Sequence, residues 1–528
     1  MWGRRNRSLG TGDRTVALHK AKYGSYYDYS GGVNCYAPGH LIADDECFAR
    51  RDSYNGTRNV YWDGRVIRRK GSLQVNAAAV GSYCVNAVRF YRSATPQRTT
   101  FAAIEETTDT GLYYLNASSV LTKLTGGTAF STGAMVHFTK WKDSLYCASS
   151  TTVMQKVTYS GSWARADITG LTSQPSLIYH HKDRLFAAGG NMAEGYMEAC
   201  DYDDDTEWAA GNGEAFNVGY KDGDPINRLI SLGDDLVVLK NDSIWMLRGD
   251  NLYNWYQHRE EASHGCVAAL SAVDIGFGIV FLSQDNIYYF NGEGIKPIGT
   301  NVKPWLDLIP VSLKSKAAAC YHDGFYRLAF ASSGASTYND RELWLDVKKF
   351  SLTGKPAWWL MDGRKIAAYI PYDGPDEGSN AGLYFADGAT AYVRRAAIGT
   401  QDDSVDIGAE LHSKFYTMQN PNQAKMYGTF KADTGLGIGS VELQILRNLD
   451  EGYALQKTLD AAGAGGTLGA TTLGTSMWTA QGASRKSFEI PLPSEMDGSA
   501  ISWQFSHAGD YDDVVFYGAS FDWKYKAF

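Results

Sequence analysis

The sequence predicts an all-β protein, and three observations support this. Glycine (56 residues) and tyrosine (34 residues) are frequent in the 528-residue chain. Short runs of β-branched and aromatic residues recur between Asn, Asp, Gly and Ser, as in strands joined by turns. A β-hairpin pattern is repeated within the chain. Apolar residues at helical spacing are scarce, and one short helix is expected, around residues 304–316.

Composition and charge restrict the function classes. The chain is 44% hydrophobic and 20% charged, with a mean hydropathy of -0.31, as in globular proteins. Its net charge of -8 argues against a surface built to hold nucleic acid, which needs clustered positive charge. No apolar run approaches the roughly 20 residues of a membrane-spanning helix. No membrane insertion is therefore expected, and no secretory signal is expected at the basic N-terminus.

The clearest internal repeat pairs residues 236–249 (LVVLKNDSIWMLRG) with residues 279–292 (IVFLSQDNIYYFNG). Asp242 aligns with Asp285 in the turn, and Ile244 aligns with Ile287 in the second strand. Each copy is an apolar strand, a polar turn and an aromatic strand, which is the pattern of a β-hairpin. Both isoleucines are expected to be buried between neighbouring sheets.

Weaker copies of the hairpin surround this pair at a spacing of roughly 40–45 residues, the period of β-propeller blades with four strands each. They lie at residues 112–124, 145–159, 184–190, 326–350 and 383–394. We therefore expect a β-propeller of six or seven blades over residues 76–400. A string of β-sandwiches with chance similarity is the alternative.

Two regions flank the propeller. Residues 1–75 are expected to form an extended N-terminal arm with the first strands, and they carry 13 Lys and Arg against 7 Asp and Glu. Residues 401–528 mix apolar and polar positions as half-exposed strands do, which indicates a C-terminal β-sandwich. A Gly-, Ala- and Thr-rich stretch at residues 461–475 is expected to be a surface loop.

The search for catalytic and cofactor motifs favours a protein that is not an enzyme. No phosphate-binding loop, paired zinc-ligand cysteines or nucleophile elbow occurs in the sequence. The acidic run DYDDDTEW at residues 201–208 has the alternate aspartates of a Ca²⁺ loop, but it has Thr206 where that loop needs glycine. No catalytic residue, cofactor or metal site is predicted. The seven scattered cysteines are expected to be buried and reduced.

One basic segment is the candidate for a binding surface. The sequence WDGRVIRRKGS carries Arg65, Arg68, Arg69 and Lys70 within six positions. Such a cluster can contact an acidic surface of a neighbouring subunit or ring. The alternative is a solvated turn that precedes a strand.

Several segments resemble the tail nozzle or tail-hub β-propeller proteins of short-tailed bacteriophages. The similarity is one of pattern over residues 29–305, carried by residues 29–72, 176–190, 205–208, 235–250 and 264–302. The resemblance implies a virion structural protein with an N-terminal segment, a propeller and a C-terminal β domain. It also implies a homohexameric ring below the portal and adaptor proteins, next to tail fibre or tip proteins.

In that setting the ring would be a conduit for genome ejection, made in the host cytoplasm and assembled into the virion tail. DNA would pass through the lumen without specific binding, because a lumen of mixed or negative charge does not hold a polyanion. A carbohydrate-binding or carbohydrate-cleaving propeller acting at a host surface is the alternative, and it requires a pocket with converging aromatic residues and paired carboxylates. A generic scaffold propeller is a third hypothesis.

Overall fold

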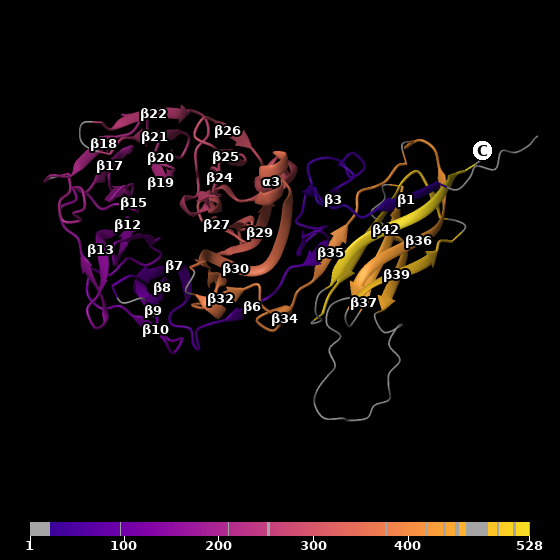
Figure 1. Cartoon of the computed structure of the whole chain (residues 1–528), viewed down its shortest axis with the longest axis horizontal. Helices are drawn as coiled ribbons and strands as arrows, with labels where there is room; N and C mark the ends of the chain where they lie inside the picture. Colours follow the sequence, from indigo (N-terminus) through magenta and orange to yellow (C-terminus); the bar gives the residue numbers. More distant parts are fainter. Residues whose placement is uncertain are drawn as a thin grey trace, which may run out of the picture.

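The computed structural model describes residues 22–94, 97–209, 211–250, 254–374, 377–418, 420–436, 440–448, 453–460, 484–493, 496–509 and 514–526. Most of these residues lie in short antiparallel strands, so the all-β class predicted from the sequence is confirmed. Two bodies lie side by side, a ring of sheets and a smaller stack of sheets (Figure 1). Within the described part of the chain, no helix has the length and apolarity needed to cross a bilayer.

Five four-stranded antiparallel sheets make up most of the first body, here called the ring body. The first sheet holds β7 (Tyr83–Arg92), β8 (Gln97–Glu105), β9 (Thr110–Leu115) and β10 (Leu121–Lys123). The second holds β11 (His137–Trp141), β12 (Ser144–Ser149), β13 (Thr152–Tyr159) and β14 (Trp163–Asp167). The third holds β15 (Leu177–His181), β16 (Arg184–Ala188), β17 (Tyr196–Ala199) and β18 (Glu214–Asn217).

The fourth sheet holds β19 (Ile226–Leu232), β20 (Asp235–Lys240), β21 (Ile244–Arg248) and β22 (Tyr256–Glu261). The fifth holds β23 (Val273–Asp274), β24 (Ile279–Leu282), β25 (Ile287–Phe290) and β26 (Ile295–Pro297). In each of these sheets the strands pair in sequence order. Each sheet is therefore a meander of consecutive hairpins, as the repeat in the sequence predicts.

A nine-stranded sheet completes the ring body. Its strands are β27 (Ala318–His322), β28 (Phe325–Phe330), β29 (Asn339–Asp346), β30 (Trp358–Tyr372), β31 (Gly382–Asp387), β32 (Val393–Ala396), β6 (Ser72–Gln74), β33 (Gln401–Asp402) and β34 (Val405–Asp406). The long strand β30 pairs with β29 through residues 358–366 and with β31 through residues 366–372. It therefore ends one group of four strands and begins the next.

The five four-stranded sheets and the two parts of the nine-stranded sheet that begin at β27 and at β30 follow one another around the ring body. Their first strands contact one another in a closed circuit, which runs through β7, β11, β15, β19, β23, β27 and β30 and returns to β7. Apolar side chains fill the spaces between neighbouring sheets. Between the fourth and fifth sheets, for example, the core contains Val237, Met246, Phe281 and Phe290. The ring body is therefore β-propeller-like, with sheets that bury their faces against each other.

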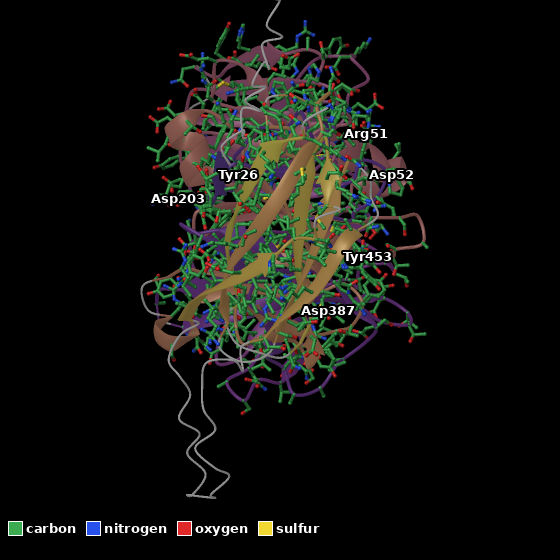
Figure 2. All side chains as sticks on the ribbon, turned by 90° about the vertical axis from the view of Figure 1, so that its right-hand side faces the viewer. Tyr26, Arg51, Asp52, Asp203, Asp387 and Tyr453 are labelled. Carbon is green, nitrogen blue, oxygen red and sulfur yellow. The ribbon has the colours of Figure 1, made fainter. Side chains whose placement is uncertain are left out.

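The second body stacks two sheets. One contains β39 (Ser484–Pro491), β36 (Lys425–Leu436), β42 (Val515–Tyr525), β5 (Val66–Arg68) and β4 (Val60–Trp62), with β1 (Lys22–Tyr26) on β42 and β40 (Asp497–Gly498) on β36. The other contains β35 (Ala409–His412), β41 (Ile501–His507), β37 (Ser440–Arg447) and β38 (Tyr453–Asp460). Figure 2 looks onto this body, with Tyr26 and Tyr453 on opposite sides of it.

Aromatic rings join the two sheets of the second body. Trp503 of β41 packs against Phe430 of β36 and Phe521 of β42, with ring centroids 5.6 and 5.9 Å apart. Phe505 stacks on Phe516 at 5.5 Å. All five side chains are fully buried. The two sheets therefore pack on an apolar core, and this core is continuous with ring-body residues such as Trp305 and Trp358.

The N-terminal segment is distributed over both bodies instead of forming one separate arm in its described part. Strands β1, β4 and β5 belong to the second body, and β6 pairs with β32 in the ring body. Between them, β2 (Gly32–Asn34) and β3 (Glu46–Phe48) form a small parallel pair. Residues 1–21 of the expected arm, and residues 461–475 of the expected loop, lie outside the described residues.

The helix expected around residues 304–316 is present as two short helices, α1 (Lys303–Leu308) and α2 (Val311–Lys314). They are separated because Pro310 lacks a backbone N–H and disfavours helical geometry in the residue before it. A third helix, α3 (Val347–Thr353), replaces the end of the hairpin copy that the sequence indicated at residues 326–350. Single turns of 3-10 helix occur at Ala269–Ser271, Thr300–Val302 and Gly378–Asn380.

The repeated hairpin and the cysteines agree with the sequence analysis. Ile244 and Ile287 both have 0% exposure and lie in inter-sheet cores. The turns after β20 and β24 hold Asp242 and Asp285 at equivalent places. All seven cysteines are buried and free of disulfide bonds.

Candidate functional site: the charged junction

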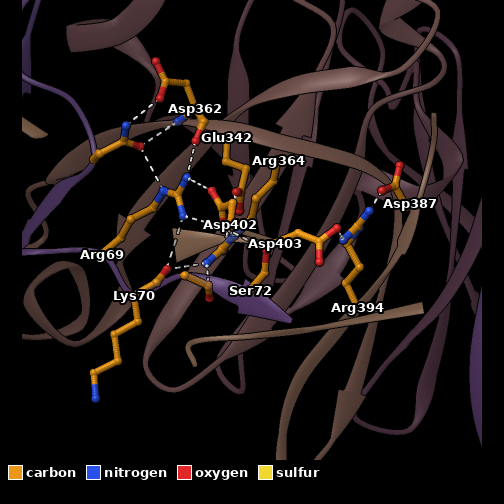
Figure 3. Close-up of polar contacts among 12 residues, drawn as sticks. Arg69, Lys70, Ser72, Glu342, Asp362, Arg364, Asp387, Arg394, Asp402 and Asp403 are labelled. Carbon is orange, nitrogen blue, oxygen red and sulfur yellow. Dashed lines mark hydrogen bonds and ion pairs between the residues drawn. The ribbon is translucent and has the colours of Figure 1, made fainter. Parts of the chain in front are cut away.

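A cleft of about 400 Å³ lies where the N-terminal strand β6 meets the end of the ring body. Its walls come from β6, β30, β31 and β32 and from residues 402–408, which lead into the second body. Charged side chains dominate the lining. They and the neighbouring Glu342 form two adjacent groups of contacts, one around Arg69 and Arg364 and one around Arg394 (Figure 3). We call this set the charged junction; it contains Arg69, Arg364, Arg394, Glu342, Asp362, Asp387, Asp402 and Asp403.

Arg69 is the centre of the charged junction, with an exposure of 1%. Its Nε donates to Asn59 Oδ1 at 2.9 Å, and its Nη2 donates to the backbone carbonyl of Asp362. Both terminal nitrogens donate to the carboxylate of Asp402, as Figure 3 shows. Burial alone would lower the pKa of Arg69, but the combined effect of Asp402, Glu342 and Asp362 outweighs burial and raises the pKa.

Asp402 connects Arg69 to a second buried arginine. Arg364 Nε lies 3.6 Å from Asp402 Oδ1, and Ser72 Oγ donates to the same oxygen at 2.8 Å. Burial alone would raise the pKa of Asp402, but the charges of Arg69 and Arg364 outweigh it and hold the pKa below its usual value. Arg364 itself has a lowered pKa, because it is buried and lies close to the positive charge of Arg69.

The remaining contacts of Arg364 tie three chain segments together. Its Nη2 donates to the carbonyl oxygen of Lys70 at 2.7 Å, and its Nη1 lies 3.6 Å from Glu342 Oε1. Glu342 also accepts hydrogen bonds from Trp344 Nε1 and from the hydroxyl of Tyr369. The guanidinium therefore bridges the N-terminal segment and the strands β29 and β30.

Arg394, on β32, forms a second set of ion pairs with carboxylates. Its Nε donates to Asp387 Oδ2 at 2.6 Å, and its Nη1 lies 2.8 Å from Asp403 Oδ2. Asp387 also accepts the backbone N–H groups of Ala389 and Thr390, which fixes the turn between β31 and β32. Strand β32 is thus attached to the segment that enters the second body.

Two glycines allow the backbones to approach closely at the charged junction. A Cβ atom on Gly71 would lie 1.8 Å from the carbonyl oxygen of Gln401. Gly363 has a φ of +93°, and a Cβ there would lie 3.1 Å from Arg69 Nη2. Larger residues would push apart the strands that the arginines hold together.

The charges of the cleft nearly balance, with one more acidic than basic residue in the lining. Its lining includes the basic residues Arg69, Arg364, Lys365 and Arg394 and the acidic residues Asp362, Asp387, Asp402, Asp403 and Asp406. The three arginines are each engaged by carboxylates of the same chain. This arrangement can hold strands together, since buried pairs of this kind are costly to break, and it offers little net attraction to a polyanion.

The structure divides the basic segment that the sequence analysis singled out. Arg69 is in the charged junction, and Arg68 is also buried, with Nη1 donating to the carbonyl of Gly509 at 2.9 Å. Arg65 and Lys70 are exposed. Alternation along β5 turns Val66 and Arg68 inward and leaves Ile67 half-exposed. Arg69 follows the strand and is buried with its partner Asp402. Only Arg65 and Lys70 of the four remain available on the surface of one chain.

The acidic run at residues 201–208 forms a turn whose aspartates make ion pairs with lysines of neighbouring strands. Lys142 Nζ lies 2.7 Å from Asp203 Oδ1, and Lys156 Nζ lies 2.6 Å from Asp205 Oδ2. Trp208 is buried beneath the turn. Among the described residues, no group of three or more His, Cys, Asp or Glu is placed to hold a metal ion.

Most of the charged junction was missed by the sequence analysis. Arg364, Arg394 and Asp402 lie far from Arg69 in the sequence and are not part of a short motif. The signal that could have indicated them is the occurrence of charged residues inside otherwise apolar strands, such as Glu342 in β29 and Arg364 in β30.

No protein-family model matches the sequence, and no curated protein matches it. Solved structures similar to the chain in three dimensions include the following two. One is YCF48 bound to D1 peptide, which is 10% identical, with a TM-score of 0.40 over 65% of this chain and 98% of that chain. The other is the computationally designed Ika8 protein, also 10% identical, with a TM-score of 0.35 over 65% of this chain and 96% of that chain.

Proposed function

We propose that the chain is a structural protein of the tail of a short-tailed bacteriophage. In this proposal it is a seven-bladed β-propeller with a C-terminal β-sandwich, and six copies form a ring below the portal and adaptor proteins. The ring serves as a conduit for genome ejection. The proposal is supported by the sequence resemblance over residues 29–305 and by the matching order of an N-terminal segment, a ring of sheets and a further β body.

The observation that carries the proposal is the way in which one N-terminal segment ties two β bodies into a single unit. Strand β1 pairs with β42, and β6 pairs with β32. Between them, Arg69 is buried in ion pairs with Asp402. A wall element of a conduit has to keep its shape while DNA passes under pressure, and a unit cross-connected in this way has few ways to bend.

The exposed basic side chains Arg65 and Lys70 are the proposed contact to an acidic surface of a neighbouring subunit or ring. A single exposed ion pair contributes only about 0–1 kcal/mol. A ring repeats each contact at every subunit, so small contributions add up. The overall charge of -8 suits a lumen through which DNA moves without being held.

The test is the assembly state of the purified chain and its presence in particles. We expect light scattering and negative-stain images to show a closed ring, with six-fold averages, and antibody labelling to place the protein on the tail axis. A chain that stays monomeric at all concentrations and is absent from particles would overturn the proposal. Glycan hydrolysis that disappears when one carboxylate is replaced would instead favour the carbohydrate-cleaving alternative.

A charge-reversal pair tests the basic contact separately. Arg65→Glu combined with Lys70→Glu is expected to weaken ring formation, with a strong dependence on salt. The matched control is Lys348→Glu with Lys355→Glu, which changes the net charge equally at two other exposed positions. Equal assembly of both double variants would remove Arg65 and Lys70 from the interface.

A further inference from the structure

The first strands of the sheets in the ring body carry an excess of basic residues. These strands surround the middle of the ring body, here called the axis, and β30 takes part through residues 366–372 (Figure 1). The one acidic residue in the described first strands is Asp274, at the end of β23. The basic residues, apart from histidines, are Arg89, Arg92, Lys140 and Arg228. Positive charge is therefore concentrated at the axis of a chain whose net charge is -8.

Solvent reaches the first strands from the axis. Strands β11, β15 and β19 are each the edge strand of their own sheet, and neighbouring sheets cover their two faces. Residues in the middle of these strands are nevertheless only half-buried, namely Phe138, Tyr179 and Arg228. Their remaining exposure is therefore toward the axis.

A cavity of about 120 Å³ opens at the end of the axis where the first strands begin. Its lining includes Tyr83 at the start of β7, Met135 just before β11, Lys316 just before β27 and Ile366 of β30. Lys316 is the only charged residue in the described lining, and it is exposed. The opening to the axis therefore attracts anions.

Two of the four basic side chains already have partners. Arg89 donates to both carboxylate oxygens of Glu377, at 2.9 and 2.8 Å, and the guanidinium of Arg92 lies over an aromatic ring. Lys140 and Arg228 form no ion pair with a described residue. These two side chains supply the uncompensated positive charge at the axis.

Arg228 is the less exposed of the two. Its Nε is buried and has no hydrogen-bond partner among the described residues. Burial lowers the pKa of Arg228, and the titratable groups that oppose this effect are Tyr179 and Cys266, neither of which is a carboxylate. Burial and the charge of Arg228 together lower the pKa of His137 to about 3. Since β15 lies between the strands of His137 and Arg228, this charge acts across the axis.

The hydroxyl of Tyr179 lies at the axis as well. Its oxygen accepts the backbone N–H of Ser231 at 3.0 Å. That N–H points from the free edge of β19, because β20 pairs with the other edge. The hydrogen of the Tyr179 hydroxyl donates to no described residue, so it is available to an acceptor at the axis.

Lys140 adds a second charge, near the opposite end of β11 from His137. Although Lys140 is exposed, the protein around it and the charges of Arg98 and Arg89 lower its pKa in spite of Asp373. Charged groups that protein surrounds are costly unless they are paired. The lack of a carboxylate for Arg228 within the chain therefore indicates a counter-ion from solution.

We propose that the axis of the ring body binds a small anion that carries a phosphate group, with Arg228 as its main binding residue. The guanidinium of Arg228 donates to two phosphate oxygens, the hydroxyl of Tyr179 donates to a third, and Lys140 adds attraction along the axis. A phosphate fits these donors better than a carboxylate, which has two oxygens. The site lies within one chain and does not depend on the proposed hexameric ring.

The test is calorimetric titration of the full chain with inorganic phosphate at pH 7 in a chloride-free buffer. We expect saturable binding of one phosphate per chain, and at least tenfold weaker binding of acetate. Equal affinity for phosphate and acetate, or no saturable binding of phosphate at millimolar concentration, would overturn the proposal.

Variants assign the binding groups. Arg228→Met is expected to weaken phosphate binding tenfold or more, and Tyr179→Phe is expected to weaken it about threefold or more. The matched control is Arg259→Met, since Arg259 is exposed on β22, the strand of the same sheet that is farthest from the axis. Arg228→Met protein that binds phosphate like the Arg259→Met control would contradict the assignment.

Thermal melts give a second readout and show that each variant is folded. Without phosphate, Arg228→Met is expected to melt at the same temperature as the parent or higher, because it removes an uncompensated charge. Phosphate should raise the melting temperature of the parent and of Arg259→Met, but not that of Arg228→Met. An equal rise in all three proteins would refute binding at the axis.

The phosphate group has two sources, the free ion and a small phosphate ester. Glycerol 3-phosphate separates them when its affinity is compared with that of inorganic phosphate. Tighter binding of glycerol 3-phosphate indicates an ester, and tighter binding of inorganic phosphate indicates the free ion. Glycerol itself should fail to bind in either case, and its binding with equal affinity would refute recognition of the phosphate group.

Discussion

Ile244 and Ile287 occupy the same place in two copies of one hairpin, and each is fully buried between sheets. Replacing either residue by alanine removes apolar contacts and leaves a cavity. We expect Ile244→Ala and Ile287→Ala each to lower the free energy of unfolding by about 2–5 kcal/mol, measured by denaturant titration. Val405→Ala is the control, since Val405 is 66% exposed. Variants that unfold like the parent would contradict the equivalence of the two hairpins.

The ion pair between Arg69 and Asp402 makes the free energy of unfolding depend on pH in the acidic range. The pKa of Asp402 lies below its usual 3.8 in the folded chain, because Arg69 and Arg364 outweigh the effect of burial. The pair therefore stabilises the fold fully above pH 3.8, and this contribution is lost as the pH falls through the folded pKa.

We expect Asp402→Asn to lower the free energy of unfolding by about 3–5 kcal/mol at pH 7, with a smaller difference from the parent below pH 3.8. Urea titrations from pH 7 to pH 3 measure both quantities. Asp63→Asn, at an exposed position, should change little at either end of this range. A difference between Asp402→Asn and the parent that does not shrink in acid would show that the charge of Asp402 is not what stabilises the fold.

At the scale of elements, strand β6 depends on a close crossing of two backbones. A Cβ on Gly71 would lie 1.8 Å from the carbonyl of Gln401, a contact that requires the backbone to move. We expect Gly71→Ala to destabilise the protein by about 1–3 kcal/mol or more and to lower its melting temperature. Gly334→Ala is the matched control, because no atom lies within 4 Å of the Cβ it would add. Equal melting temperatures would show that β6 does not need this approach.

The strands could be predicted from the sequence where apolar and turn residues alternate locally. The hairpin of β24 and β25 is an example, since Ile279 begins an apolar strand, Asp285 lies in the turn and Ile287 begins the aromatic strand. Helix α3 was missed because its residues continue the apolar run of β29. Its boundaries depend on Asp346, whose side chain accepts from Lys349 N, and on Gly354 with a φ of +68°.

The charged junction could not be predicted in the same way. Arg69 was singled out as a surface residue because it lies in a basic cluster. Its burial depends on Asp402, which is 333 positions away and carries no signal of the pairing. Long-range pairing of this kind is decided by the arrangement of the whole chain, so Arg68 and Arg69 differ from Arg65 and Lys70 in exposure although the four lie together in sequence.

At the scale of the whole molecule, the two bodies share one segment and should unfold together. Strands β4 and β5 complete a sheet of the second body, and β6 completes the last sheet of the ring body. We expect one cooperative transition in scanning calorimetry, with a calorimetric enthalpy equal to the van't Hoff enthalpy. Arg69→Met should make the transition broader or divide it. Two separate transitions in the parent protein would contradict this coupling.

The pairing of the first strands with the last has a consequence for synthesis on the ribosome. Asn76 accepts a hydrogen bond from Val393 N, 317 positions later, so the ring body cannot close until that residue has been made. At about 5–20 residues per second this takes roughly 15 to 60 s. The hydrogen bond between the hydroxyls of Tyr23 and Ser520 forms later still, because these residues are 497 positions apart. The emerging chain therefore carries unpaired strand edges for most of its translation, when identical nascent chains on one message are nearest to each other.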